Sequence, residues 1–414
     1  MPFSLWQVPA ALVAAGVLCI SPRSAGAQEA SRPTSADSTP PPQPSRRAWY
    51  ERLSLRGYTQ VRYNRLLETN PDLVCAQCDR SIGRNGGFFI RRARLVVSGD
   101  VSDRLSVYIQ PDLATEAAGS LHFAQLRDAY FDVFLDAGKT FRVRVGQSKI
   151  PFGWENLQSS SNRLPLDRAD PLNSAMPNER DLGVFAYWSP TEARKRFRIL
   201  TDSGLKGTGD YGVVGVGTFN GQTANRPEAN NGQHVVARVT YPFRFAGGQF
   251  VEVGVQGYDG RVVVPSSQRT AGVAGGPNFD DRRAAATLVI YPQPVGFQAE
   301  WNTGTGPEID LASQTIANRR LEGGYAQTML RTRFRHQFLT PFIRAQYYRG
   351  GKKQETDARR YRMREYEVGA EWLPFSALEL TAMYTISDRR FEDAATPDNR
   401  QRGQLLRLQA QFNY

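Results

Sequence analysis

The sequence has very few of the residues from which metal sites and nucleophilic active sites are built. Its 414 residues include only three cysteines and three histidines. The histidines, His122, His234 and His336, lie in separate segments, and none has an evident Ser or Asp partner by spacing. A structural zinc site needs about four ligands, and a hydrolase needs a nucleophile with a positioned base. The sequence therefore predicts no metal site, no cofactor and no enzymatic activity.

Long hydrophobic runs are also missing, apart from one near the N-terminus. Residues 8–20 form an apolar run that is too short to span a bilayer, and an Ala-Gly-Ala triplet follows that ends at Ala27. We therefore expect a cleaved signal peptide over residues 1–27, although no Lys or Arg precedes the run. The next segment, 28–48, is rich in Pro and Ser and is expected to be a periplasmic linker. The folded domain should then cover residues 49–414.

Removal of the signal peptide would leave only two cysteines, Cys75 and Cys78, because Cys19 lies within it. The remaining pair lies in a polar stretch with no second pair nearby. We expect a small loop disulfide, as is typical of an oxidising compartment. Metal binding or redox chemistry by this pair is the alternative.

From residue 49 onward the chain alternates apolar and polar side chains, and no stretch shows a sustained helical period. The last stretch, for example, places Leu406 and Leu408 on one face and Arg407 and Gln409 on the other. These stretches have about ten to fourteen residues, whereas soluble strands have about five or six and membrane-crossing strands about nine to eleven. The pattern predicts an all-β transmembrane antiparallel barrel with its apolar face toward lipid and its polar face toward a water-filled lumen.

Strand number follows from the candidate stretches and from the even count of bacterial barrels. Roughly seventeen stretches can be counted, and the weakest is the short, highly charged segment 195–201. We therefore expect about sixteen strands, with eighteen as the alternative.

Short turns should alternate with long outer loops at 64–87, 260–282 and 388–402. The expected girdle of aromatic residues near strand ends consists of Phe88, Phe89, Trp188, Tyr241, Phe243, Tyr291, Tyr347 and Trp372.

The chain has little lysine, so its positive charge is carried almost entirely by arginine. Lysine accounts for 6 of the 52 Lys and Arg residues, which leaves 46 arginines, and the net charge is +12. Guanidinium groups stay charged and can hold phosphate or carboxylate oxygens in two places, and rings of arginine in a pore favour anions. The arginines that we expect to line the pore and bind anions are Arg92, Arg94, Arg142, Arg144, Arg331, Arg333, Arg335 and Arg344.

Several alternatives to an anion channel stay open. Glu300, Glu365, Glu367 and Glu371 are also expected to face inward and would limit selectivity, so a nonselective pore is one alternative. An outer-membrane barrel enzyme and an adhesin without conductance are others. Nucleic-acid binding is not expected, because the arginines alternate with apolar residues along strands that follow a signal peptide.

A set of motifs between Phe88 and Gly221 resembles the phosphate-selective porin O/P family of Gram-negative outer membranes. The most specific is Val145-Gly-Gln-Ser-Lys-Ile-Pro-Phe-Gly-Trp-Glu155. The supporting motifs are Arg91-Arg-Ala-Arg-Leu95, Leu126-Arg-Asp-Ala-Tyr130, Arg180-Asp-Leu-Gly-Val184 and Phe219-Asn-Gly221. Similarity to this family implies passive diffusion of small anions, with phosphate or polyphosphate as the first expectation and a general or carboxylate-preferring porin as the alternative.

The same resemblance implies a homotrimer of sixteen-stranded barrels in the outer membrane, each with its third extracellular loop folded into the lumen. In this chain that loop would be Pro151 to Arg180. Its basic residues, counting the lysine just before it, are Lys149, Arg163, Arg168 and Arg180. The C-terminal aromatic, Tyr414, resembles the signal that the outer-membrane insertion machinery recognises.

Overall fold

The computed structural model of the protein describes residues 48–75, 82, 87–117 and 120–414. The expected signal peptide (1–27) therefore lies outside the described residues, as do the linker up to residue 47 and Cys78.

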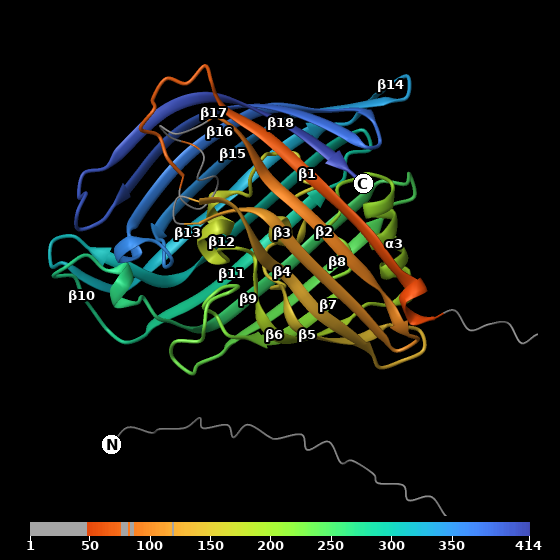
Figure 1. Ribbon diagram of the computed structural model, residues 1–414, viewed down its shortest axis with the longest axis horizontal. Coiled ribbons are helices and arrows are strands. Elements are labelled where there is room, and N and C mark those ends of the chain that lie inside the picture. The colour runs from red at the N-terminus through yellow and green to blue at the C-terminus, as the bar shows by residue number, and fades with distance from the viewer. Residues whose placement is uncertain (1–47, 76–81, 83–86, 118–119) are drawn as a thin grey trace, which may run out of the picture. The chain divides into compact units, whose positions relative to one another are not determined.

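The described residues form a closed antiparallel barrel of sixteen long strands, and two short strands are attached to it (Figure 1). Each long strand pairs with its neighbours in the chain, and β1 pairs with β18 to close the sheet. The long strands are β1 (Leu53–Leu66), β2 (Phe88–Ser102), β3 (Leu105–Ala117), β4 (Ser120–Phe134), β5 (Phe141–Lys149), β6 (Arg180–Trp188), β7 (Val214–Phe219), β8 (His234–Arg244), β9 (Phe250–Val262), β11 (Phe279–Ile290), β12 (Val295–Asp310), β13 (Thr315–Leu330), β15 (Gln337–Gly351), β16 (Arg360–Phe375), β17 (Leu378–Glu392) and β18 (Arg400–Asn413). The short ones are β10 (Ala274–Gly275), parallel to β13, and β14 (Thr332–Phe334), which pairs with β15. The prediction of a sixteen-stranded barrel is confirmed.

The barrel has its apolar side chains outside and its polar side chains inside. On β18, Leu408 and Phe412 are exposed on the outer face, whereas Arg407 and Gln409 are buried within the barrel. The same alternation recurs on β16, where Val368 is exposed and Glu367 is buried. This arrangement confirms the predicted orientation of the two strand faces.

Helices occupy only a small part of the described chain. They are η1 (Trp49–Arg52), α1 (Trp154–Leu157), α2 (Asp170–Ala175), α3 (Thr191–Asp202), η2 (Ser266–Gln268) and η3 (Thr356–Ala358). None of these helices is long and apolar enough to cross a bilayer.

The weakest strand candidate, residues 195–201, is part of the helix α3, so it was correctly left out of the strand count. Our expectation that the chain contains no sustained helical period was wrong here. Ala193, Phe197 and Leu200 are the buried residues of α3, and their spacing of three to four residues forms one apolar stripe among charged neighbours. The charge of the other positions hid this short period in the sequence.

The two rims of the barrel differ in the length of their loops. At the terminal rim, where β1 begins and β18 ends, most connections are short, for example 291–294 between β11 and β12. The opposite end, the loop rim, carries the longer connections. The three predicted long loops are each shorter than we predicted, at 67–87, 263–278 and 393–399, because polar and charged residues that we assigned to loops continue the strands.

The expected aromatic girdle is found only in part. Phe88, Trp188, Phe243 and Trp372 are exposed near strand ends. Tyr291 is instead buried, and its hydroxyl donates to Glu252 Oε2 at 2.6 Å, so it belongs to the interior.

Replacing Val368 by arginine should destabilise the barrel in lipid. Val368 is 51% exposed in the apolar band of β16, which consists of the outer-face residues Tyr366, Val368, Ala370 and Trp372. An arginine at the bilayer midplane costs a transmembrane barrel roughly 2–4 kcal/mol, and one near the interface about 0–1 kcal/mol. We expect V368R to lose about the midplane amount in free energy of unfolding, measured by urea titration in phospholipid vesicles. The control is A377R, in the exposed turn between β16 and β17; equal losses in both variants would contradict the position of the band.

Candidate functional site

The connection between β5 and β6, residues 150–179, folds into the barrel and is buried over almost its whole length. We call it the constriction loop; it confirms the predicted loop in the lumen. It touches opposite walls, because Ser160 Oγ lies 2.7 Å from Tyr58 Oη on β1, while Trp154 Nε1 donates to Glu252 Oε2 on β9 at 3.2 Å. The loop therefore spans the lumen.

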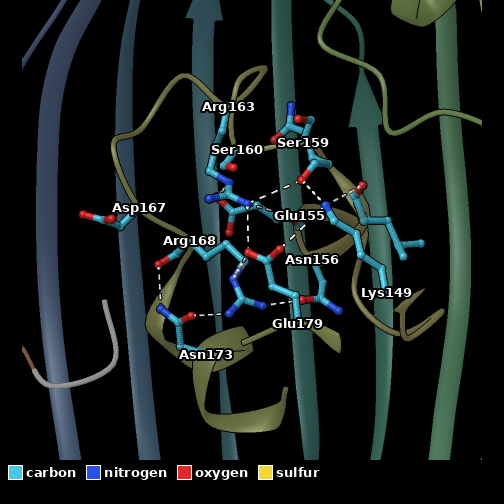
Figure 2. Close-up of polar contacts among 12 residues, drawn as sticks. Lys149, Glu155, Asn156, Ser159, Ser160, Arg163, Asp167, Arg168, Asn173 and Glu179 are labelled. Carbon is cyan, nitrogen blue, oxygen red and sulfur yellow. Dashed lines mark hydrogen bonds and ion pairs between the residues drawn. The ribbon is translucent and has the colours of Figure 1, made fainter. Parts of the chain in front are cut away.

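Glu179, at the end of the constriction loop, is surrounded by all four basic residues that we assigned to this loop. Its carboxylate lies 3.7 Å from Lys149 Nζ, 3.5 Å from Arg163 Nη2, 3.0 Å from Arg168 Nε and 2.9 Å from Arg180 Nη1. Figure 2 shows Glu179 among Lys149, Arg163 and Arg168, with all four side chains directed toward one another. Burial alone would raise the pKa of Glu179, but these cations together hold that pKa well below its usual range.

Asp167 points away from this group and joins the loop to the seam where the barrel closes (Figure 2). Its Oδ2 accepts a hydrogen bond from Arg62 Nη1 on β1 at 3.1 Å and from Arg407 Nη1 on β18 at 2.6 Å. Glu155 binds the wall elsewhere, because its Oε1 accepts from Arg344 Nη1 on β15 at 2.9 Å. Two loop carboxylates thus hold three strands.

Asp170, at the start of α2, has a further set of partners at the loop rim. Its Oδ1 accepts from Lys352 Nζ at 2.7 Å, its Oδ2 accepts from the Tyr361 hydroxyl at 2.7 Å, and Arg389 Nη1 lies 3.8 Å from Oδ2. Burial acts to raise the pKa of Asp170, but the charges of Lys352 and Arg389 lower it. Asp170 therefore remains ionised, and its charge is compensated.

Most of the predicted arginines inside the barrel are paired with carboxylates. Arg344 donates to Glu367 as well as to Glu155. The closest carboxylates of the others lie on neighbouring strands or a nearby loop: Arg94 to Asp112 at 2.8 Å, Arg142 to Asp210 at 3.2 Å, and Arg144 to Asp132 at 2.8 Å. These side chains are buried in the barrel, as expected of pore-lining residues, but their charges are largely compensated by carboxylates.

Arg331, Arg333 and Arg335, which we expected to line the pore, do not lie on the inner face of a long strand. Arg331 follows the end of β13, Arg333 lies in the three-residue strand β14, and Arg335 lies in the turn with φ of 56°. All three stack over phenylalanine rings of this hairpin at the terminal rim, and Arg333 and Arg335 are exposed. They lie apart from the constriction loop's basic residues, so the structure does not bring the two predicted groups together.

Four arginines of the wall and loop end form what we call the basic corner: Arg92, Arg94, Arg127 and Arg180. Arg94 and Arg180 pair with Asp112 and Asp128, respectively, at 2.8 Å. Arg92 and Arg127 make no ion pair with any described residue. Arg92 Nη1 donates to the amide oxygen of Gln60 at 2.8 Å, and Arg127 Nη2 donates to the carbonyl of Asn178 at 3.1 Å. The basic corner therefore carries two buried guanidinium groups that form no direct ion pair with a described carboxylate.

Arg127 was missed in the sequence because it is adjacent to Asp128, and simple alternation would place the two on opposite faces. Both are buried, since the pairing of β3 with β4 shifts register between Gln110↔Asp128 and Pro111↔Leu126. A bulge of this kind admits two successive residues to one side of a strand. The only sequence signal was the Leu126-Arg-Asp-Ala-Tyr130 motif, which contains both residues.

The acidic residues that we expected to face inward are buried, and three of them are paired with basic side chains. The pairs are Glu365 with Arg389 (2.6 Å), Glu367 with Arg344, and Glu371 with Lys206 (2.5 Å). Glu300 differs, because it accepts hydrogen bonds from the backbone N–H of Trp154 and from the hydroxyl of Thr287. It therefore holds the start of α1 and, in the described part of the chain, has no basic partner.

Cys75 is disulfide-bonded and packs in a small buried cluster with Leu73, Ile82 and Leu405. Its expected partner, Cys78, lies outside the described residues, so the pairing of Cys75 with Cys78 stays a prediction. Across the described ranges, no group of three or more His, Cys, Asp or Glu side chains is placed to hold a metal ion.

Comparison with known proteins gives one family and a set of similar folds. The family model described as "Phosphate-selective porin O and P" matches residues 72–414. No curated protein matches the chain in sequence.

Three solved structures are similar in fold, although their sequence identities are low. The outer membrane channel DcaP of Acinetobacter baumannii is 12% identical, with a TM-score of 0.52 over 87% of this chain and 97% of that one. An anion-selective porin from Comamonas acidovorans is 9% identical, with a TM-score of 0.52 over 87% and 99%. OmpT of Vibrio cholerae in its trimer form is 12% identical, with a TM-score of 0.50 over 88% and 100%.

Replacing Glu179 by glutamine should loosen the constriction loop while the barrel stays folded. The substitution keeps the shape of the side chain but removes the charge that four cations share. Removing one partner of a buried ion pair costs about 3–5 kcal/mol, because the remaining charge is left uncompensated. We expect faster hydrogen exchange at the backbone amides of residues 150–179, with little change in the strands. The control is E192Q on α3, where the carboxylate of Glu192 is exposed and pairs with Lys195. If hydrogen exchange at residues 150–179 were accelerated equally in E192Q, the role of Glu179 would be contradicted.

Acid should loosen the same loop. A carboxyl with a lowered pKa stabilises the folded state above its unfolded-state pKa, and this contribution is lost as the pH falls through the folded-state pKa. Glu179 and Asp170 both have a lowered pKa, so protection of the loop amides should stay constant from neutral pH downward and fall only below about pH 4. Loss of protection near pH 7 would show that other groups control the loop.

Proposed function

This chain belongs to the phosphate-selective porin O and P family, and we propose that it lets small anions diffuse passively across the outer membrane. The family and the porin folds similar to it indicate an outer-membrane channel rather than an enzyme. Short turns at the terminal rim and longer loops at the other are the asymmetry of such barrels, so the loop rim faces the cell exterior.

Preference for anions is supported above all by the basic corner. Arg92 and Arg127 carry permanent charges beside the constriction loop, and their hydrogen bonds go only to neutral oxygens of the described residues. An anion passing this corner would be attracted by both charges, whereas a cation would be repelled by them. Glu365, Glu367 and Glu371 each pair with a basic side chain, which weakens their effect on this field, although Arg344 and Lys206 are shared with further carboxylates.

Inorganic phosphate is the anion that we propose to test first, with polyphosphate next. A guanidinium offers a planar pair of donors that matches two phosphate oxygens. The printed family name points to the same anion, and a similar fold belongs to a porin described as anion-selective. Passage of small carboxylates, without phosphate specificity, is the second candidate, because the same donors fit a carboxylate equally well.

Export, insertion and assembly complete the proposal. Residues 1–27 would be a cleaved signal peptide, and Tyr414 would present its aromatic ring to the insertion machinery. The backbone N–H of Tyr414 donates to the carbonyl of Gly57 at 3.0 Å, so the C-terminus lies at the closing seam of the barrel. A homotrimer is proposed from the family resemblance and from the trimer form of the similar OmpT fold.

Charge selectivity can be measured directly in planar bilayers. We expect the reversal potential of the wild-type channel in a potassium chloride gradient to have the sign of anion preference. Replacing Arg92 and Arg127 by glutamine should lower the chloride-to-potassium permeability ratio by about threefold, because each substitution removes one positive charge that has no direct ion-pair partner. Phosphate added to one side should reduce the chloride current if it binds in the lumen.

The matched control is Arg198→Gln, which removes an exposed arginine of α3 outside the lumen. This variant should keep the wild-type permeability ratio. Cation preference of the wild-type channel would refute the proposed anion selectivity, and a chloride current insensitive to phosphate would leave the carboxylate-preferring or general porin as the function.

A further inference from the structure

A row of arginines crosses the outer face of four neighbouring strands near the loop rim. The strand register pairs Arg349 of β15 with Arg362 of β16, Arg362 with Arg390 of β17, and Arg390 with Arg400 of β18. All four are exposed, and the residues on either side of Arg349, Arg362 and Arg390 in the chain are buried. Directly paired residues on adjacent strands have Cβ atoms about 4.5–5.5 Å apart, and like charges at such positions are destabilising. Negatively charged groups from outside these four arginines would therefore stabilise the row.

Direct ion pairs and hydrogen bonds with carboxylates are found at one end of the row. Arg400 makes two hydrogen bonds with Asp388, at 2.9 and 2.7 Å, and Arg390 lies 3.5 Å from Glu392. By contrast, Arg349 and Arg362 make no hydrogen bond or ion pair with any described residue. Glu322, which is register-paired with Arg349, is instead 3.3 Å from Arg320.

An apolar groove of about 570 Å³ lies on the outer face immediately beside this uncompensated end. It runs across β11, β12, β13, β15 and β16, and it exists because small residues alternate there with large aromatic ones. Its lining includes Ala299, Trp301, Gly324, Ala345, Tyr347 and Tyr366. The rings of Trp301 and Tyr347 stack at 6.2 Å with an interplanar angle of 9°.

Arg364 links the groove to the arginine row. It lines the groove, it is register-paired with Tyr347, and it lies two residues from Arg362 on the same exposed face of β16. Within the described chain, Arg364 has no hydrogen bond or ion pair, because its register partner on β17, Asp388, binds Arg400 and Arg402 instead. From Tyr366 to Trp372 the outer face of β16 is the apolar band. The guanidinium groups of Arg349, Arg362 and Arg364 therefore lie at the edge of this band that is nearer the loop rim.

We propose that this face binds a phosphorylated lipid of the outer leaflet. One acyl chain would lie in the groove, and a phosphate would be held between Arg349, Arg362 and Arg364. The order of features matches such a lipid, which is anionic at the membrane surface and apolar below it. Arginine suits this phosphate, because its fork can donate two hydrogen bonds to one phosphate group. The site lies on the outer wall and is independent of which solute the lumen selects.

The test uses the full-length protein, freed of lipid in detergent, with lipid A carrying two phosphates as the probe. Binding is followed by native mass spectrometry, and the comparison probes are dephosphorylated lipid A and inorganic phosphate. We expect the bisphosphorylated lipid to bind wild type most tightly, and R349Q/R362Q to bind it about tenfold more weakly. Ala345→Phe, which fills the groove, should weaken binding of both lipid forms.

Two matched variants serve as controls, and each should bind as wild type does. Arg198→Gln removes an exposed arginine at the opposite rim, and Ala382→Phe adds the same bulk on the outer face of β17 outside the groove. Heat-modifiable gel mobility will confirm that every variant is folded.

Equal binding by R349Q/R362Q and wild type, or equal binding of the two lipid forms by wild type, would overturn the proposal. So would a crosslink between copies of the A345C variant through that position, since a second subunit would then occupy the groove.

Discussion

The constriction loop stays in the lumen because each of its four buried carboxylates is shared by more than one basic side chain of its surroundings. Glu179 has four such neighbours, while Glu155, Asp167 and Asp170 have at least two each. A buried charge is tolerated only when it is paired and hydrogen-bonded, so loop and wall depend on each other. Neither set of charges could remain buried if the other were removed.

This mutual dependence extends to the closure of the barrel. Arg62 on the first strand and Arg407 on the last both donate to Asp167, so one loop carboxylate bridges the seam between β1 and β18. The same seam carries a hydrogen bond from Gln60 to Gln411 at 2.6 Å. Residues more than a hundred positions apart in the chain thus meet at the point where the sheet closes, and the loop reinforces the backbone ladder there.

The fold could be predicted from the sequence because alternation is a local property, whereas charge pairing is not. Arg92 and Arg94 look equivalent in the sequence, and both are buried, yet only Arg94 has a carboxylate partner, Asp112 on the next strand. That difference depends on register, which the sequence leaves open. The helix α3 and the inward position of Arg127 were not predicted from the sequence for related reasons, since a short charged helix and a one-residue bulge both break simple alternation.

The hairpin of β15 and β16 shows that the two faces of one wall follow opposite rules. Inside the barrel, the register places Arg344 opposite Glu367, and the pair is hydrogen-bonded. Outside, the same register places Arg349 opposite Arg362. Inside the barrel, a buried charge is costly unless it is paired, so most of the inward arginines of the described chain lie beside carboxylates, with Arg92 and Arg127 of the basic corner as exceptions. The outer rim is in contact with lipid headgroups, which can supply the counter-charge themselves. The uncompensated arginines outside are therefore explained by the membrane in which the barrel lies, in the same way that the paired arginines inside are explained by the loop.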